Sequence, residues 1–225
     1  MTFLELCQRT AREGGIEGGL SSVTAQIGMN LKIVQWVTDA WADLQIQRSW
    51  LFMRATGTFT LTAAQTDYAI FSQLGLVNVK SWCSPTFHAT DTLGRYTITL
   101  LEYGDFQSRL QGQDVQVNRP AYCALAPGYR MVFDAAPTIN ATVVNDYWKT
   151  SQTLVNDTDE PNMNEDWHMA IVYKALRDYA EHEESKEMVV RARRKFMGVF
   201  GEMCEVELPA FTMPVTPLSW GQRAA

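Results

Sequence analysis

Apolar residues recur at helical spacing near the start of the chain. Thr2 and Glu5 form the capping-box pattern that begins a helix, which we expect to end at Gly14-Gly15. A second helix is predicted from Asn30, where apolar residues recur every three or four positions in two neighbouring lines. These lines are Leu31, Val34, Val37, Trp41 and Leu44, and beside them Ile33, Trp36 and Ala40. So broad an apolar surface predicts either contacts on more than one side or a thick core.

The same spacing returns after residue 160. Asp, Pro and Asn residues precede a predicted helix whose first turn carries Glu165 and Asp166, side chains that suit the positive end of a helix. A further helix is predicted from Lys186 to about Cys204. On the first of these helices, two neighbouring lines are expected to face inward: one of Met169, Val172, Leu176 and Tyr179, and one of Trp167, Ile171 and Lys174. On the second helix, the residues expected to face inward are Val189, Ala192, Phe196, Phe200 and Met203.

Between the helices the apolar period changes to two. The segment TGTFTLT places Phe59 and Leu61 on one face and threonines on the other, which predicts a half-buried strand. Pro127-Gly128 indicates a hairpin between two further strands. Strands are predicted within 75–82, 95–102, 121–127, 129–136 and 142–150, with a short surface helix at 103–112. Residues from about 55 to about 155 are therefore expected to form a mostly antiparallel sandwich or barrel.

The predicted fold class is α+β. Residues 1–54 and 160–205 are expected to build one helical bundle, and residues 55–159 an inserted antiparallel β domain. Because both ends of that domain return to the bundle, at Arg54 and near Pro161, its loops are expected to face away from the helices. Residues 206–225 are expected to form an extended C-terminal arm.

The predicted arm is apolar but cannot be a continuous helix. Pro209, Pro214 and Pro217 remove backbone donors, and apolar residues alternate between them. A free tail would be polar, so the arm either folds back on its own bundle or is buried by another chain, which we favour. The residues expected to bind are Leu208, Phe211, Met213, Val215, Leu218 and Trp220.

The charge balance argues against tight nonspecific binding of nucleic acid. Nineteen basic and twenty-five acidic residues give a net charge of −6, whereas such binding needs Lys and Arg to neutralise phosphates. One basic cluster, Arg191 to Lys195, could contact nucleic acid or an acidic neighbour, or pair with Glu184 and Glu187 upstream. We favour pairing within the helix or a salt bridge between subunits over DNA.

Nothing in the sequence assembles into a catalytic pattern. Glu165 and His168 have the spacing that helps build di-iron sites, but such a site needs a second copy of the motif. GxSxG, HExxH and Walker motifs are absent. The four cysteines, Cys7, Cys83, Cys123 and Cys204, form no CxxC pair and are interpreted as free thiols in a reducing compartment. We predict no enzyme activity, no metal and no cofactor.

The sequence also lacks the pattern of an exported or membrane-spanning protein. The N-terminal segment has no basic-then-apolar arrangement, and no apolar run approaches the roughly 20 residues of a membrane helix. We therefore expect a cytosolic protein with no membrane partner.

Four segments carry a resemblance to a known family. They are MTFLELCQRTARE, VQWVTDAWADLQIQRSWLFMR, GTFTLTAAQTDYAI and PNMNEDWHMAIVYKALRDYAEHE. The chain resembles the head-to-tail adaptor (connector) proteins of tailed bacteriophages. The resemblance implies a ring of identical subunits, normally dodecameric, in the virion neck after assembly from the host cytoplasm. It implies partners in the portal protein and in a tail, nozzle or tail-completion protein, with double-stranded DNA passing through the lumen without specific binding. It also implies that the C-terminal arm grips the portal.

Trp36, Trp41, Trp167, Arg191 and Arg194 are the residues expected at contacts between subunits. Trp36 and Trp41 lie about 140° apart around an ideal helix, so one flat core cannot easily cover both, and Trp36 is the one favoured to reach a neighbour. The alternative function is a tail-tube or head-completion structural protein that assembles through its β domain.

Overall fold

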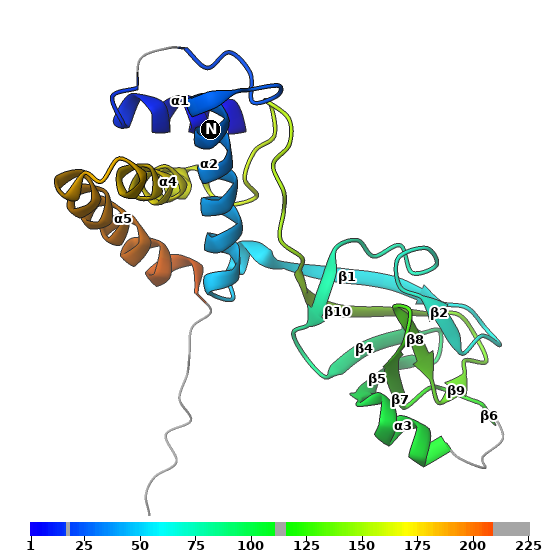
Figure 1. Ribbon diagram of the computed structural model, residues 1–225. Coiled ribbons are helices and arrows are strands. Elements are labelled where there is room, and N and C mark those ends of the chain that lie inside the picture. The colour runs from blue at the N-terminus through cyan, green and yellow to red at the C-terminus, as the bar shows by residue number, and fades with distance from the viewer. Residues whose placement is uncertain (17–18, 111–115, 209–225) are drawn as a thin grey trace, which may run out of the picture.

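The computed structural model describes residues 1–16, 19–110 and 116–208. It has the predicted α+β fold, with helices at one end of an elongated molecule and a curled sheet at the other (Figure 1). The chain crosses from the helices to the sheet once before strand β1 and returns once after strand β10. Both flanks of the chain therefore supply helices, and residues 54–149 supply the sheet.

Local signals set the first helix. Helix α1 (Phe3–Glu13) begins with the predicted capping box, in which the backbone N–H of Thr2 donates to Glu5 Oε2 over 2.8 Å and that of Glu5 donates to Thr2 Oγ1. It ends at Gly14, as predicted. A Cβ at Gly14 would lie 2.9 Å from the Tyr179 ring, so glycine lets the end of α1 approach that side chain closely.

Helix α4 lies at the centre of the helical part. The other helices of this part are α2 (Gly28–Gln47), α4 (His168–His182) and α5 (Lys186–Glu207). The short 3-10 turn η1 (Leu51–Met53) lies between α2 and β1, and η2 (Glu165–Trp167) directly precedes α4. Helix α4 packs against α1, α2 and α5. Helix α2 begins before the predicted Asn30, and α5 continues beyond the predicted Cys204 to Glu207. Residues 206 and 207, assigned to the arm from the sequence, are therefore helical.

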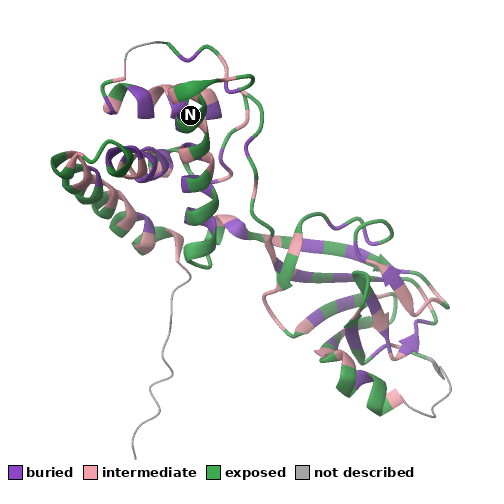
Figure 2. Ribbon diagram, in the orientation of Figure 1, coloured by how far each residue is buried: buried purple, intermediate pink, exposed green. Residues whose placement is uncertain are grey.

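The buried faces of α2 and α5 differ from the predicted lines. On α2 the buried apolar residues come from both predicted lines, whereas Leu31, at the start of the first line, is exposed and Val34 is half-buried. The buried residues are Ile33, Val37, Ala40, Trp41, Leu44 and Gln45. On α5 only Ala192 and Met203 are buried, while Val189, Phe196 and Phe200 are half-buried. Helix α5 packs mainly against α4, so the side that faces the bundle is covered and the opposite side is exposed (Figure 2).

The segment between the helices contains more strands than the sequence predicted. Its elements are β1 (Arg54–Leu61), β2 (Asp67–Ala69), β3 (Val79–Trp82), β4 (Thr86–Asp91), β5 (Gly94–Leu101), α3 (Tyr103–Leu110), β6 (Gln116–Val117), β7 (Tyr122–Ala126), β8 (Arg130–Phe133), β9 (Ala135–Ala136) and β10 (Ala141–Lys149). The main sheet has the strand order β1-β10-β4-β5-β7-β8-β2, with β3 added to β10, and β6 and β9 form a separate two-stranded sheet. Strands β2, β4 and β6 were not predicted, and the strand predicted at 129–136 is divided into β8 and β9.

Whether two paired strands run parallel or antiparallel depends on the segment that connects them. Strands β5 and β7 run parallel because helix α3 lies in the connection between them, and β6 and β9 are also parallel. The other pairs of described strands are antiparallel, including the predicted β7–β8 hairpin, which turns at Pro127-Gly128-Tyr129. Phe59 and Leu61 face the interior of the curled sheet, as the alternation on β1 predicted.

Three clusters of buried residues form the interior of the described part of the chain. The main helical cluster and a small one of Leu176, Tyr179 and Ala192 lie among the helices, and the third lies inside the curled sheet. The junction between the helices and the sheet is marked by Trp50, which is fully buried before β1, and by Trp148, at the end of β10, which packs against the main helical cluster. Whether residues 55–159 fold as an independent domain stays a prediction.

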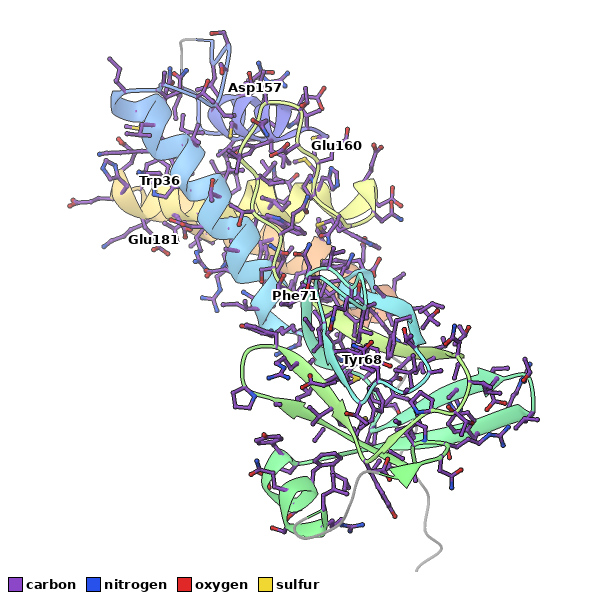
Figure 3. All side chains as sticks on the ribbon, turned by 90° about the vertical axis from the view of Figure 1, so that its right-hand side faces the viewer. Trp36, Tyr68, Phe71, Asp157, Glu160 and Glu181 are labelled. Carbon is purple, nitrogen blue, oxygen red and sulfur yellow. The ribbon has the colours of Figure 1, made fainter. Side chains whose placement is uncertain are left out.

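Residues 150–164, here called the strap, return from the sheet and tie the helical part together. Gln45 on α2 exchanges two hydrogen bonds with the backbone of Gln152, at 2.7 and 2.9 Å. Asp157 Oδ1 accepts from the backbone N–H of Val23 over 2.6 Å and from Ser22 Oγ over 3.1 Å. Figure 3 shows Asp157 and Glu160 on this strap. The strap thereby holds α1, the loop after it and α2 in one arrangement.

Candidate assembly surfaces

The tryptophans expected at subunit contacts occupy different environments. Trp36 is half-buried on α2 and packs edge-on against Tyr179 and His182 of α4, with ring centroids 5.7 and 5.4 Å apart. His182 Nε2 also lies 2.7 Å from the ammonium nitrogen of Lys32. Trp36 therefore links α2 to α4 and still presents part of its ring at the surface (Figure 3). Its contact with a neighbouring subunit stays a prediction.

Trp41 is enclosed by its own chain. Its side chain is 1% exposed and its ring stacks on Phe52, with centroids 6.0 Å apart. The buried apolar residues of α2 come from both predicted lines, and Trp41 is one of them. The indole has no surface left for another subunit, so Trp41 is removed from the candidate contact residues.

Trp167 is partly covered by its own chain. The side chain is half-buried at the end of η2 and packs against the helical cluster. Its Nε1 atom is buried and has no hydrogen-bond partner within the described part of the chain, but the same holds for Nε1 of Trp41 and of Trp82. The contact of Trp167 with a neighbouring subunit therefore stays a prediction.

The arginines of the basic cluster lie on the outward surface of α5, whereas Lys195 is half-buried and pairs with Glu13 at 3.2 Å. Arg191 and Arg194 are exposed, and no ion pair within the described ranges joins either of them to Glu184 or Glu187. Arg191 Nη2 makes one long contact, 3.5 Å, with the backbone oxygen of Glu13. The two arginines are therefore available to a partner, and pairing within the helix is not observed. Their role between subunits stays a prediction.

The described residues end at the start of the predicted arm. Leu208 follows α5 directly, is half-buried and packs against the helical cluster. Phe211, Met213, Val215, Leu218 and Trp220 lie outside the described residues. Their expected contact with the portal rests on the sequence.

Sequence reasoning missed the exposed apolar side chains on the outer sides of α2 and α5. On α2 these are Ile27, just before the helix, with Leu31 and Ile46; on α5 they are Val190, Met197 and Val206. Helix α4 lies between α2 and α5, so the two groups belong to different sides of the bundle (Figure 1). Leu31 had been assigned to a predicted apolar line, whereas Ile27, Ile46, Val190, Met197 and Val206 belong to none of the predicted lines, and that position was the available signal.

Comparison with known protein families identifies the class of protein. Residues 1–217 match the family described as SU10 adaptor protein. The chain belongs to this family. It is thus a bacteriophage adaptor-type protein, from a family that is structural and not typically enzymatic. No curated protein matches the chain.

Burial suppresses the ionisation of two cysteines of this adaptor. Burial raises the pKa of Cys7 to about 12 and that of Cys123 to about 12, so neither thiol provides a thiolate near neutral pH. Among the residues that the structure describes, no three His, Cys, Asp or Glu side chains are placed to hold a metal ion together. None of the described helices is long and apolar enough to cross a membrane.

His168 of the adaptor is an interior residue, whereas Glu165 is exposed. Burial is the main cause that lowers the pKa of His168, and the N-terminal ammonium, 2.8 Å from Nδ1, lowers it further. Below the ordinary histidine pKa of about 6.5, the unfolded chain takes up a proton that the folded chain resists. The folded state therefore loses stability as the pH falls below that value toward the lowered pKa.

We expect His168→Gln to reduce this pH dependence. Between about pH 7.5 and 5.5, the urea midpoint of the variant should fall less than that of the natural protein. The exposed ring of His88 offers a matched control, and His88→Gln should keep the natural pH dependence. An identical fall in the natural protein and in His168→Gln would contradict the assignment.

Proposed function

We propose that this adaptor forms a ring between the phage portal and the tail or nozzle and extends the DNA channel there. The ring is dodecameric, like those of the head-to-tail adaptors that the sequence resembles. The observation that carries the proposal is the pair of exposed apolar surfaces on α2 and α5, on different sides of α4. Contact between two different surfaces of identical subunits is head-to-tail and closes into a ring when the rotation permits.

The charge of the chain fits a channel through which DNA passes. A net charge of −6 provides no broad basic surface, so double-stranded DNA can move through the lumen without specific binding. Trp36, Trp167, Arg191 and Arg194 remain the side chains proposed at the contacts between subunits. The arm from Leu208 to Trp220 is the element proposed to bind the portal.

A second exposed apolar surface lies on the sheet. Phe71 and Tyr129 are 44% and 67% exposed, and their ring centroids are 5.1 Å apart. In the proposed ring these loops face the tail or nozzle. The same pair favours the alternative function, in which a tail-tube or head-completion protein assembles through its β domain.

Cryo-electron microscopy of the portal bound to the adaptor separates the two functions. We expect α2 and α5 of neighbouring subunits to form the ring wall, and the Phe71–Tyr129 loops to point away from the portal. A ring wall built from strands, with the helices at its periphery, would overturn the proposal and support the alternative.

A further inference from the structure

The outward face of α5 presents apolar side chains that the bundle does not cover. Val190, Met197 and Val206 are 68%, 56% and 60% exposed. They lie along nearly the whole of a helix of 22 residues, of which only Ala192 and Met203 are buried. Figure 2 shows this helix as mostly exposed or half-buried. Val190 and Met197 are seven positions apart and share one side of the helix, whereas Val206 lies nine positions after Met197 and therefore on the opposite side. The two neighbouring apolar side chains indicate a surface that a partner covers.

The charges on this helix are divided between its two halves. Arg191, Arg193 and Arg194 are exposed in the first half, whereas Glu202 and Glu205 are exposed in the second. Apart from Glu187 in the first turn, this order opposes the helix dipole, which favours acidic residues near the N-terminus and basic residues near the C-terminus. The arrangement is unfavourable for a helix by itself. A partner with the reverse order of charges would compensate for it.

The charges on this face are arranged symmetrically about Gly198, so two antiparallel copies of the face are complementary. Arg194 and Glu202 lie four positions before and after this glycine, and Arg191 and Glu205 lie seven positions before and after it. A second copy of α5 running in the opposite direction therefore places each arginine opposite a glutamate, and each pairing occurs twice.

Val190, Met197 and the glycines fit the same arrangement. Val190 and Met197 lie on the side of α5 that also carries Arg194, Gly201 and Glu205. A Cβ added at Gly198 or Gly201 would have no atom within 4 Å, so the middle of the face is open and a second helix can approach it closely.

We propose that two copies of the free adaptor pair through antiparallel α5 helices about a two-fold axis near Gly198. The occupant of this face is a second copy of the chain, because the order of charges that compensates α5 is that of α5 reversed. The pair covers Arg191 and Arg194, which the proposed ring also uses, so it separates before a ring closes. Pairing of the free chain goes beyond the proposed ring and does not depend on it.

The pair is expected to be weak and sensitive to salt. From Val190 to Glu205 the helix extends about 22 Å, and one such helix pair buries less than the roughly 1,600 Å² of a standard interface. A dissociation constant of about 10–100 µM is therefore expected at low salt. Its ion pairs are exposed, so added salt weakens it.

Sedimentation velocity of the full chain, from about 10 to 300 µM, tests the proposal. The natural protein should form a dimer that dissociates on dilution. Arg191→Glu with Arg194→Glu makes the face wholly acidic, and Glu202→Arg with Glu205→Arg makes it wholly basic. Each double variant should dimerise at least about tenfold more weakly, because every opposite-charge contact becomes repulsive.

The decisive sample is the equimolar mixture of the two double variants. Antiparallel pairing sets the acidic face against the basic one along the whole helix, so the mixture should form mixed dimers. The variant with all four substitutions should regain dimerisation for the same reason. If α5 instead bound α2 of another copy, or residues 209–225 of its own chain, mixing would restore nothing.

A control variant carries the same change of charge elsewhere. Lys80→Glu with Arg95→Glu, both exposed on the sheet, should leave dimerisation unchanged. Circular dichroism verifies that each variant is folded. A natural protein that is monomeric throughout this range would overturn the proposal. Dimers that persist in both double variants would also overturn it, and so would a mixture that stays as monomeric as its two components. A ring observed on the portal would not reverse any of these results.

Discussion

Replacing Trp50 with alanine is expected to lower the free energy of unfolding by about 3–5 kcal/mol. The indole is fully buried where α2 ends and the chain turns toward the sheet. It packs edge-on against Phe200 of α5 and stacks on Phe52, with centroid separations of 5.6 and 6.1 Å. Its Nε1–H also donates to the backbone oxygen of Leu44 over 2.6 Å. Alanine would leave a cavity between three segments and an unpaired carbonyl at the end of α2.

Two variants separate these contributions. Trp50→Phe keeps most of the ring but loses the hydrogen bond to Leu44, so a loss of about 1–2 kcal/mol is expected. Trp36→Ala removes a half-buried ring from the same bundle and should have a smaller effect than Trp50→Ala. Urea unfolding followed by circular dichroism measures all three. A loss below about 1 kcal/mol for Trp50→Ala would show that the junction repacks around the cavity.

The elements that the sequence predicted correctly are those with strong local signals. The capping box at Thr2 and Glu5 acts over one helical turn, and the alternation around Phe59 lies within one strand. Strand β4 was missed because its inward residues are Phe87 and Ala89, and a small alanine barely marks an apolar face. Strand β2 has three residues and exists through its pairing with β8, which is distant in sequence.

The residues expected at subunit contacts show what the helical spacing of apolar residues cannot predict. The angle between Trp36 and Trp41 indicated that one side of a core could not cover both, and one is half-buried while the other is enclosed. Trp36 is covered by Tyr179 and His182, which belong to a helix far along the chain. The apolar pattern on α2 therefore could not predict how much of each tryptophan ring is exposed. The open face of α5 was missed because Val190 and Met197 lie off the predicted apolar line.

Removing residues 209–225 is expected to leave the adaptor folded and to abolish or greatly weaken its attachment to the portal. Helix α5 continues to Glu207 and Leu208 packs against the helical cluster, so a chain that ends at Leu208 keeps every described contact. The removed segment carries Phe211, Met213, Val215, Leu218 and Trp220 between prolines. Such a segment cannot form a continuous helix, and we expect it to bury its apolar side chains on the portal.

Single substitutions should locate the anchors within this arm. Aromatic side chains dominate interface energies, so Phe211→Ala and Trp220→Ala should each cost roughly 2 kcal/mol or more, about thirtyfold in affinity. Thr216→Ala in the same segment is a matched control and should bind normally. Co-sedimentation with purified portal measures binding, and circular dichroism measures folding. Equal binding by a folded, shortened chain would rule out the arm as the portal contact. A shortened chain that unfolds would show instead that the segment belongs to the core of its own subunit.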